Sequence, residues 1–121
     1  MIRILYVEDN EDNVYMLSRR LKRKGFEIII AEDGVMGVEM AKSEKPDIIL
    51  MDLSLPKMDG WTATKKIKAE GTTRNIPIIA LSAHAMEEHK SRALESGCDD
   101  YDTKPVDMDR LLEKINQALE I

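Results

Sequence analysis

The feature that most constrains the fold is a regular alternation of short apolar runs and helical patterns along all 121 residues. The apolar runs are rich in Ile, Val and Leu and are bounded by polar or turn-forming residues, as expected of buried strands. They occupy residues 2–7, 26–31, 47–52 and 76–81, and the more polar segment CDDYDT at 98–103 is predicted to form a short fifth strand. A helical pattern follows each of these five segments, at residues 10–25, 34–42, 60–69, 86–96 and from 107 onward. This alternation predicts an α/β fold in which helices cover both faces of a five-stranded parallel sheet.

The first and last predicted helices have the clearest sequence signals. Asn10 can cap the first helix, and basic residues precede Gly25 at its end. The last helix places apolar residues along one side, at Met108, Leu111, Leu112, Ile115 and Leu119. The helix over 86–96 has a much thinner apolar face, so we expect it to be the least firmly packed.

Length and composition predict a single domain spanning 1–121, with no output domain. The hydrophobic content of 43% suffices for one core, and the net charge of -5 argues against binding to nucleic acid or anionic membranes. The sequence contains no apolar run long enough to span a bilayer, and its first residues resemble a strand rather than a leader, which predicts a cytoplasmic protein. The single cysteine, Cys98, excludes an internal disulfide and is expected to be a small buried residue.

Charged and hydroxyl side chains follow four of the predicted strands. Glu8 and Asp9 end the first strand, Asp52 the third, Ser82 the fourth and Lys104 the fifth. Ligands of such sheets bind outside the carboxyl ends of the strands, so we expect these side chains to converge on one rim. Three carboxylates beside one ammonium leave an excess of about two negative charges, which protons or a divalent cation must neutralise. Hard oxygen ligands without thiolates favour Mg²⁺.

Asp52 is the candidate reactive group at this rim. A buried carboxylate beside a divalent cation can act as a nucleophile that accepts a phosphoryl group, with Lys104 and Ser82 contacting that group. The alternative is structural: Asp52 and Lys104 form an ion pair, and Glu8 and Asp9 cap the following helix. Each residue taken alone fits the structural interpretation, but the joint occurrence of these groups at four strand ends favours a phosphoryl site.

Four sequence motifs resemble the receiver domain of bacterial two-component response regulators, and most closely the stand-alone regulators of the CheY and DivK type. The motifs are VEDN at 7–10, DLSLPKMDG at 52–60, LSAHA at 81–85 and the pair Lys104-Pro105. The resemblance covers the whole chain, with the motifs in the family's order. It implies a flavodoxin-like sheet with strand order 2-1-3-4-5, and a cis bond before Pro105.

The resemblance also implies a set of roles. Asp52 would be phosphorylated by a phosphohistidine of a kinase or phosphotransfer protein. Mg²⁺ would be held by Asp9, Asp52 and the backbone carbonyl of Ser54, with Glu8 acting through bound water, and Lys104 would pair with the phosphoryl group. Glu8 stands where the family more often has Asp, and this longer side chain could alter the metal geometry without removing charge.

Two further pairs of residues take roles by the same resemblance. Ser82, where Thr is commoner in the family, and Tyr101 would form a switch that repacks the helix at 86–96, the strand at 98–103 and the last helix for partner binding. Ser54 and His84 occupy the positions that tune dephosphorylation. Such a protein is a phosphoacceptor module that assists its own phosphorylation and dephosphorylation, rather than an enzyme acting on free substrates.

The family's phosphodonor contacts the first helix and the loop after the fifth strand, so part of the basic cluster at 19–24 is expected to dock a kinase. The expected partners are this phosphodonor and a downstream protein target, with no direct contact to nucleic acid or membrane. We expect a monomer, with phosphorylation-dependent dimerisation as an alternative. Two rivals stay open: an aspartate-nucleophile phosphatase, which usually has a second acid where Ser54 stands, and an unphosphorylated binding module.

Overall fold

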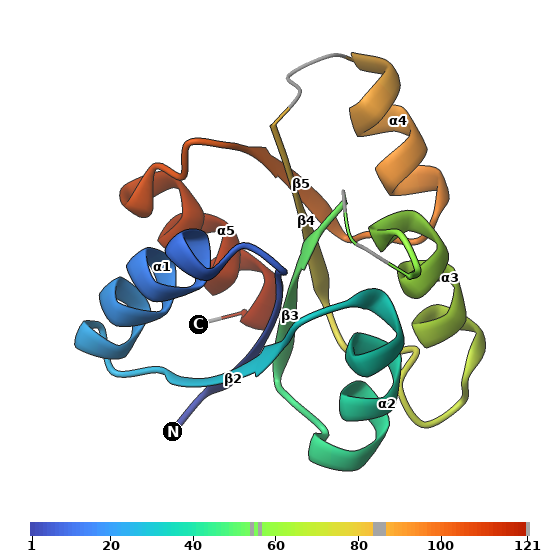
Figure 1. The fold of residues 1–121 in the computed structure, drawn as a ribbon, viewed down its shortest axis with the longest axis horizontal. Coiled ribbons are helices and arrows are strands. Elements are labelled where there is room, and N and C mark those ends of the chain that lie inside the picture. Colours follow the sequence, from blue (N-terminus) through green and yellow to red (C-terminus); the bar gives the residue numbers. More distant parts are fainter. Residues whose placement is uncertain (54, 56, 84–86, 121) are drawn as a thin grey trace.

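The computed structural model describes residues 1–53, 55, 57–83 and 87–120. A five-stranded sheet crosses the middle of the molecule, with α1 and α5 on one side and α2, α3 and α4 on the other (Figure 1). All four strand pairings are parallel, and the strand order is β2-β1-β3-β4-β5. The predicted α/β class and the flavodoxin-like order 2-1-3-4-5 are therefore confirmed.

The strands and helices lie close to the predicted segments. The strands are β1 (Arg3–Val7), β2 (Glu27–Ala31), β3 (Ile48–Asp52), β4 (Ile78–Ser82) and β5 (Asp100–Thr103). The helices are α1 (Glu11–Arg23), α2 (Gly34–Glu44), α3 (Gly60–Ala69), α4 (Glu87–Glu95) and α5 (Met108–Leu119). The prediction ended α2 two residues early, because the helix continues until Lys45 adopts a left-handed conformation (φ 48°).

Side-chain caps fix the start of four helices. The predicted cap Asn10 accepts a hydrogen bond from the Asn13 backbone N–H at the start of α1. Aspartates do the same elsewhere: Asp33 caps α2, Asp59 caps α3 and Asp107 caps α5. Each cap satisfies a backbone donor that has no partner within its helix.

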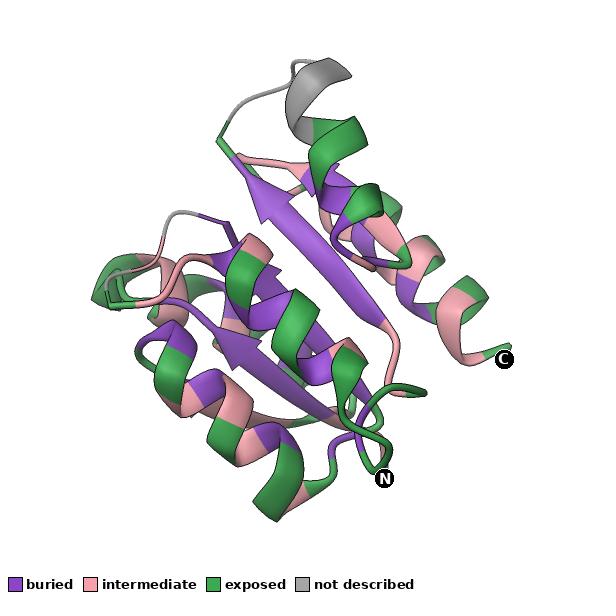
Figure 2. Ribbon diagram, turned by 90° about the vertical axis from the view of Figure 1, so that its right-hand side faces the viewer, coloured by how far each residue is buried: buried purple, intermediate pink, exposed green. Residues whose placement is uncertain are grey.

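Alternate residues of the buried strands face opposite layers. Ile4, Tyr6, Ile48, Leu50, Ile79 and Leu81 pack against Leu17 and Leu21 of α1 and Leu111 and Ile115 of α5. The intervening residues, among them Leu5, Val7, Ile49 and Met51, pack against Ala41 of α2, Ile67 of α3 and Ala93 of α4. Figure 2 shows the buried strands between helices whose outer surfaces are exposed. Two apolar layers, one on each face, therefore hold the sheet in place.

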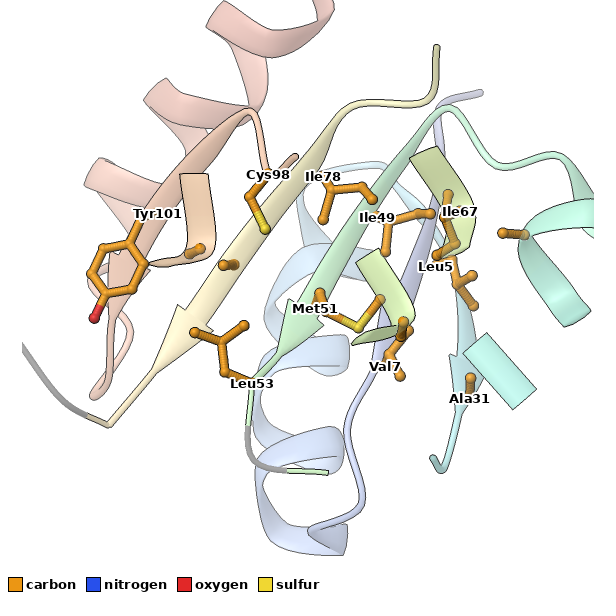
Figure 3. Close-up of a cluster of buried hydrophobic side chains, with 14 residues drawn as sticks. Leu5, Val7, Ala31, Ile49, Met51, Leu53, Ile67, Ile78, Cys98 and Tyr101 are labelled. Carbon is orange, nitrogen blue, oxygen red and sulfur yellow. The ribbon is translucent and has the colours of Figure 1, made fainter. Parts of the chain in front are cut away.

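The layer under α2, α3 and α4 is shown in Figure 3. Cys98 lies in this cluster with 6% of its surface exposed, as expected of a small buried residue. Helix α4 contributes little to it: Ala93 is fully buried, whereas Leu94 is 43% exposed. The expectation of a thin apolar face on α4 holds for the part of this helix whose side chains are described.

Candidate functional site

The strand register brings the polar strand ends to one edge of the sheet. Val7 of β1 is level with Met51 of β3, so Glu8 follows at the level of Asp52. On the other side of β3, Ser82 of β4 is level with Thr103 of β5. Lys104 directly follows Thr103 and therefore lies beside the end of β4. The side chains of Glu8, Asp52 and Ser82 are buried, with residue exposures of 1%, 4% and 3%. The predicted convergence on one rim is therefore present.

Close backbone packing fixes the position of Asp52. Gly60, the first residue of α3, lies so near the Asp52 carbonyl that a Cβ atom at this position would overlap it. The Gly60 N–H also donates to the Leu53 carbonyl at 3.1 Å, while Asp59 caps the helix. The glycine thus allows the chain that leaves β3 to return directly over the strand end.

Lys104 joins two of the carboxylates. Its Nζ lies 2.7 Å from Glu8 Oε1 and 3.2 Å from Asp52 Oδ1, and the predicted cis bond precedes Pro105. Burial opposes the charge on Lys104, but the hydrogen bond from Lys104 to Glu8 and the charge of Asp52 raise the pKa of this ammonium. Lys104 is therefore a permanent cation at neutral pH.

The two buried carboxylates respond differently to this environment. Burial, followed by the negative charge of Glu8, raises the pKa of Asp52 to about 6. Burial opposes the charge of Glu8 as well, but the hydrogen bond and charge of Lys104 outweigh it and lower the pKa of Glu8. Among the described residues, the site thus holds more negative charge than the Lys104 ammonium neutralises, and Asp52 bears the excess.

The acidic residues form a group that could hold a metal ion. One carboxylate oxygen from each of Glu8, Asp9 and Asp52 lies within 4.8 Å of the others, and Asp9 is exposed to solvent. A divalent cation would offset the repulsion that raises the pKa of Asp52. Hard carboxylate oxygens are the ligands that Mg²⁺ prefers, so the donor set fits this ion.

Two site residues were not singled out by the sequence analysis. Tyr6 donates from its hydroxyl to Glu8 Oε1 at 3.2 Å, and Asn13 donates from Nδ2 to the same oxygen at 3.3 Å. Burial, then the charge of Glu8, raises the pKa of Tyr6 far above its ordinary range, so the phenol remains a donor. The available signal was spacing: Tyr6 precedes Glu8 by two residues on one strand face.

A second missed feature joins the β2–α2 and β3–α3 loops. A Cβ atom at Gly34, the first residue of α2, would overlap the carbonyl oxygen of Met58. Beside this contact, Lys57 has a left-handed backbone (φ 65°), and its Nζ lies 3.5 Å from Asp33 Oδ2. Because Asp33 also caps α2, it connects that helix to the loop that follows Asp52.

The predicted switch residues lie at the end of the sheet nearest α4. Ser82 is buried, and its carbonyl accepts the Lys104 backbone N–H at 2.7 Å. Tyr101 is only 6% exposed and belongs to the apolar layer under α2, α3 and α4 (Figure 3). It is therefore not the half-exposed strand tyrosine that would be the alternative to a switch residue. Ser54 and His84, predicted to bind metal or tune dephosphorylation, lie outside the described residues.

A groove runs beside the site, between α1 and the segment after β5. It has a volume of about 370 Å³ and is lined by Tyr6, Asn13, Met16, Leu17, Arg20, Lys104, Pro105 and Val106. Met16 is 54% exposed, and the neighbouring Tyr15 is 63% exposed. The groove thus combines exposed apolar surface and basic groups next to the buried carboxylates.

None of the described helices is both long enough and apolar enough to cross a bilayer.

Comparison with known proteins agrees with this geometry. Residues 4–116 match the family described as response regulator receiver domain. Protein PilH of Pseudomonas aeruginosa is 39% identical over 119 residues, which cover 98% of each chain. The polar-differentiation response regulator DivK of Brucella anthropi is 35% identical over 116 residues, 96% of this chain and 94% of DivK.

A solved structure extends the likeness to the site. The receiver domain of the sensor histidine kinase PA1611 from Pseudomonas aeruginosa, which has a magnesium ion coordinated in its active site cleft, matches with a TM-score of 0.92. The two sequences are 34% identical, and the match covers 99% of this chain and 98% of that one.

Proposed function

The chain belongs to the response regulator receiver domain family, and from this premise we propose that it accepts a phosphoryl group on Asp52 from a phosphohistidine of a kinase or phosphotransfer protein. One observation carries the assignment to this residue. Asp52 is buried at a strand end, 3.2 Å from the ammonium of Lys104 and grouped with the carboxylates of Glu8 and Asp9.

The transfer is a substitution at phosphorus. A carboxylate oxygen of Asp52 forms the new bond to phosphorus, while the bond from phosphorus to the donor's imidazole nitrogen breaks and its electron pair stays on that nitrogen. A pKa of about 6 leaves most of the Asp52 carboxylate ionised at neutral pH, as a nucleophile must be. Lys104 provides a fixed positive charge for the phosphoryl oxygens, and Ser82 provides a hydroxyl donor.

The proposed cofactor is Mg²⁺, held by Asp9, Asp52 and the backbone carbonyl of Ser54, with Glu8 acting through bound water. When bound, this ion supplies positive charge that offsets carboxylate repulsion and binds phosphoryl oxygens. Water later attacks the phosphorus while the bond from phosphorus to the Asp52 oxygen breaks, which leaves the electron pair on the restored carboxylate and releases inorganic phosphate. We assign the tuning of this step to Ser54 and His84.

Phosphorylation is proposed to act on the surface formed by α4, β5 and α5. It replaces the single negative charge of the Asp52 carboxylate with a phosphoryl group that carries about -1.5 to -2 charge and three acceptor oxygens, toward which the Ser82 hydroxyl would turn. Tyr101 lies on the adjacent strand and is buried against the layer that includes Ala93 of α4. The switch is then a change in the population of this buried arrangement of Tyr101, and a downstream protein reads it by contact.

We place the phosphodonor on the groove between α1 and the segment after β5. The groove opens beside Lys104, and its wall includes exposed Met16 and the base Arg20. An apolar donor helix with acidic flanks fits this surface. We also propose that residues 1–121 form a single receiver domain that is monomeric before phosphorylation. The proposed location is the cytoplasm, where histidine kinases are phosphorylated by ATP.

Phosphorylation of the intact chain tests the assignment. The protein is incubated with acetyl phosphate and Mg²⁺ and then weighed by intact mass spectrometry. One added phosphoryl group is expected, absent after Asp52→Asn and in EDTA, and present after Asp109→Asn, which changes an exposed helix acid. Continuous turnover of small phosphate esters would instead identify a phosphatase. Absence of any adduct, under conditions that label another receiver domain, would identify an unphosphorylated binding module.

A further inference from the structure

The two oxygens of the Glu8 carboxylate have different surroundings. Oε1 accepts three side-chain hydrogen bonds: from Lys104 Nζ at 2.7 Å, Tyr6 Oη at 3.2 Å and Asn13 Nδ2 at 3.3 Å. Oε2 accepts one long bond within the described part of the chain, from the Asn10 backbone N–H at 3.4 Å. One oxygen is therefore saturated with donors, whereas the other retains capacity for a further ligand.

We infer that Tyr6 and Asn13 are positioning residues of the metal site, which hold Glu8 Oε1 so that Oε2 faces the position of the cation or its bound water. This inference rests on the proposed function, because it concerns the same acidic group. Neither residue belongs to the set that the sequence motifs identified. Each acts on the cation only through Glu8.

The length of the Glu8 side chain explains why it needs such support. Glutamate has one more rotatable bond than aspartate, so its carboxylate can occupy more positions around the strand end. Here that carboxylate is almost fully buried, at 1% residue exposure. Two directed donors on Oε1 limit its rotation, so the more open oxygen keeps one orientation.

Both donors are themselves held firmly. Tyr6 is 1% exposed and packs in the layer between the sheet and helices α1 and α5. Asn13 lies in the first turn of α1, where its backbone N–H bonds to the capping oxygen of Asn10 at 3.0 Å. Because strand packing fixes one donor and a helix cap fixes the other, the Glu8 carboxylate is held from two independent elements.

The same arrangement leaves Glu8 with hydrogen-bond donors when Lys104 moves toward a phosphoryl group on Asp52. Lys104 already bridges Glu8 and Asp52, and a phosphoryl group on Asp52 would attract it further. Tyr6 and Asn13 would then remain on Oε1, so a buried carboxylate is not left without hydrogen bonds. Glu8 could keep its orientation through the phosphorylation cycle.

The test measures Mg²⁺ affinity of the unphosphorylated full chain. Isothermal titration with MgCl₂ is applied to wild type, Tyr6→Phe and Asn13→Ala, and the fluorescence of Trp61 provides a second readout. Loss of partners that orient metal ligands typically weakens affinity about 10-fold to 100-fold, and we expect roughly 10-fold for each variant. Tyr15→Phe and Asn116→Ala are matched controls on the exposed surface and should bind as wild type does.

A double-mutant cycle separates positioning from general structural damage. In a Glu8→Asp background the shorter carboxylate lies out of reach of the Tyr6 hydroxyl, so Tyr6→Phe should no longer change the Mg²⁺ affinity. An equal loss in the wild-type and Glu8→Asp backgrounds would show that Tyr6 acts on the fold, and would overturn the inference. Urea unfolding in EDTA checks that each variant is folded before titration.

The outcomes distinguish this inference from the proposed function. If wild type binds Mg²⁺ and is phosphorylated at Asp52, while Tyr6→Phe and Asn13→Ala bind Mg²⁺ equally well, the positioning role is wrong and the proposed function stands. If wild type binds no Mg²⁺ at all, the metal part of the proposed function fails first, and the positioning role fails with it.

Discussion

Replacing Asp52 with asparagine should stabilise the protein at neutral pH when no divalent cation is present. Burial and the charge of Glu8 raise the pKa of Asp52 from 3.8 to about 6 in the folded state. Below pH 3.8 the carboxyl is protonated in both states and its ionisation does not affect stability. As the pH rises, the unfolded chain ionises first, so the folded state becomes relatively less stable until the pH passes about 6.

The size of this effect follows from the two pKa values. They differ by about 2, which corresponds to roughly 3 kcal/mol of lost stability at pH 7. Asparagine removes the charge but can still accept a hydrogen bond from Lys104, which remains paired with Glu8 at 2.7 Å. Because some protein relaxation around the charge is expected, the gain for Asp52→Asn should be about 1 to 3 kcal/mol.

Urea unfolding in EDTA between pH 4.5 and 7.5, a range set about the Asp52 pKa of about 6, measures the difference between wild type and Asp52→Asn. The gap should be largest at the neutral end and close as the pH falls. Asp33→Asn is the matched control, since the backbone N–H of Met36 is the leading cause of a lowered Asp33 pKa. The ionised Asp33 carboxylate stabilises the folded state above the pKa of the unfolded chain, and this contribution is lost in acid. Asp33→Asn should therefore be less stable than wild type near neutrality. A neutral-pH loss of stability in Asp52→Asn, or a gap that does not vary with pH, would refute the reasoning.

Three other predictions concern positions around the site. Gly60→Ala should lower the free energy of unfolding by about 2 kcal/mol or more and slow labelling by acetyl phosphate, because its Cβ would displace the Asp52 carbonyl; urea unfolding and intact mass check this. Burial raises the pKa of Cys98 to about 11, so the thiol should react with a disulfide reagent at pH 8 only after urea is added. Arg92→Ala should shift the emission of Trp61 to longer wavelength, because the guanidinium lies 3.8 Å from the ring centroid.

The fold could be predicted from sequence because its determinants are local and periodic. Four apolar runs, a short fifth strand segment and the helical segments between them allow few arrangements other than a parallel sheet with two helical layers. The cap at Asn10 was identifiable because its side chain bonds only three residues away. The end of α2 was less certain, since it depends on the left-handed conformation of Lys45, a residue with weak intrinsic preference for it.

The strand-end residues of the site could be predicted for a related reason. A strand that stops at the rim of a parallel sheet places its next side chain there, so Glu8, Asp52 and Lys104 follow from topology alone. The sequence analysis gave an Asp52–Lys104 ion pair only as the structural alternative and did not show that the same ammonium also bonds Glu8, because these contacts join residues 52 and 96 positions apart. Similarly, Gly60 was recognised as a helix start, but its contact with the Asp52 carbonyl depends on the path of the loop.

The unusual stability cost at Asp52 and the close packing around it belong to one arrangement. A carboxylate whose pKa is raised to about 6 destabilises the folded chain at neutral pH, and any ligand that adds positive charge there relieves this. A cation can relieve this destabilisation at the site itself only if the backbone at the end of β3 does not move to relieve it first. Gly60 against the backbone of Asp52, and Tyr6 and Asn13 against Glu8, oppose such movement. Binding of a cation and later of a phosphoryl group is therefore expected to change the electrostatics first, with α4, whose described apolar face is thin, responding before the site itself is distorted.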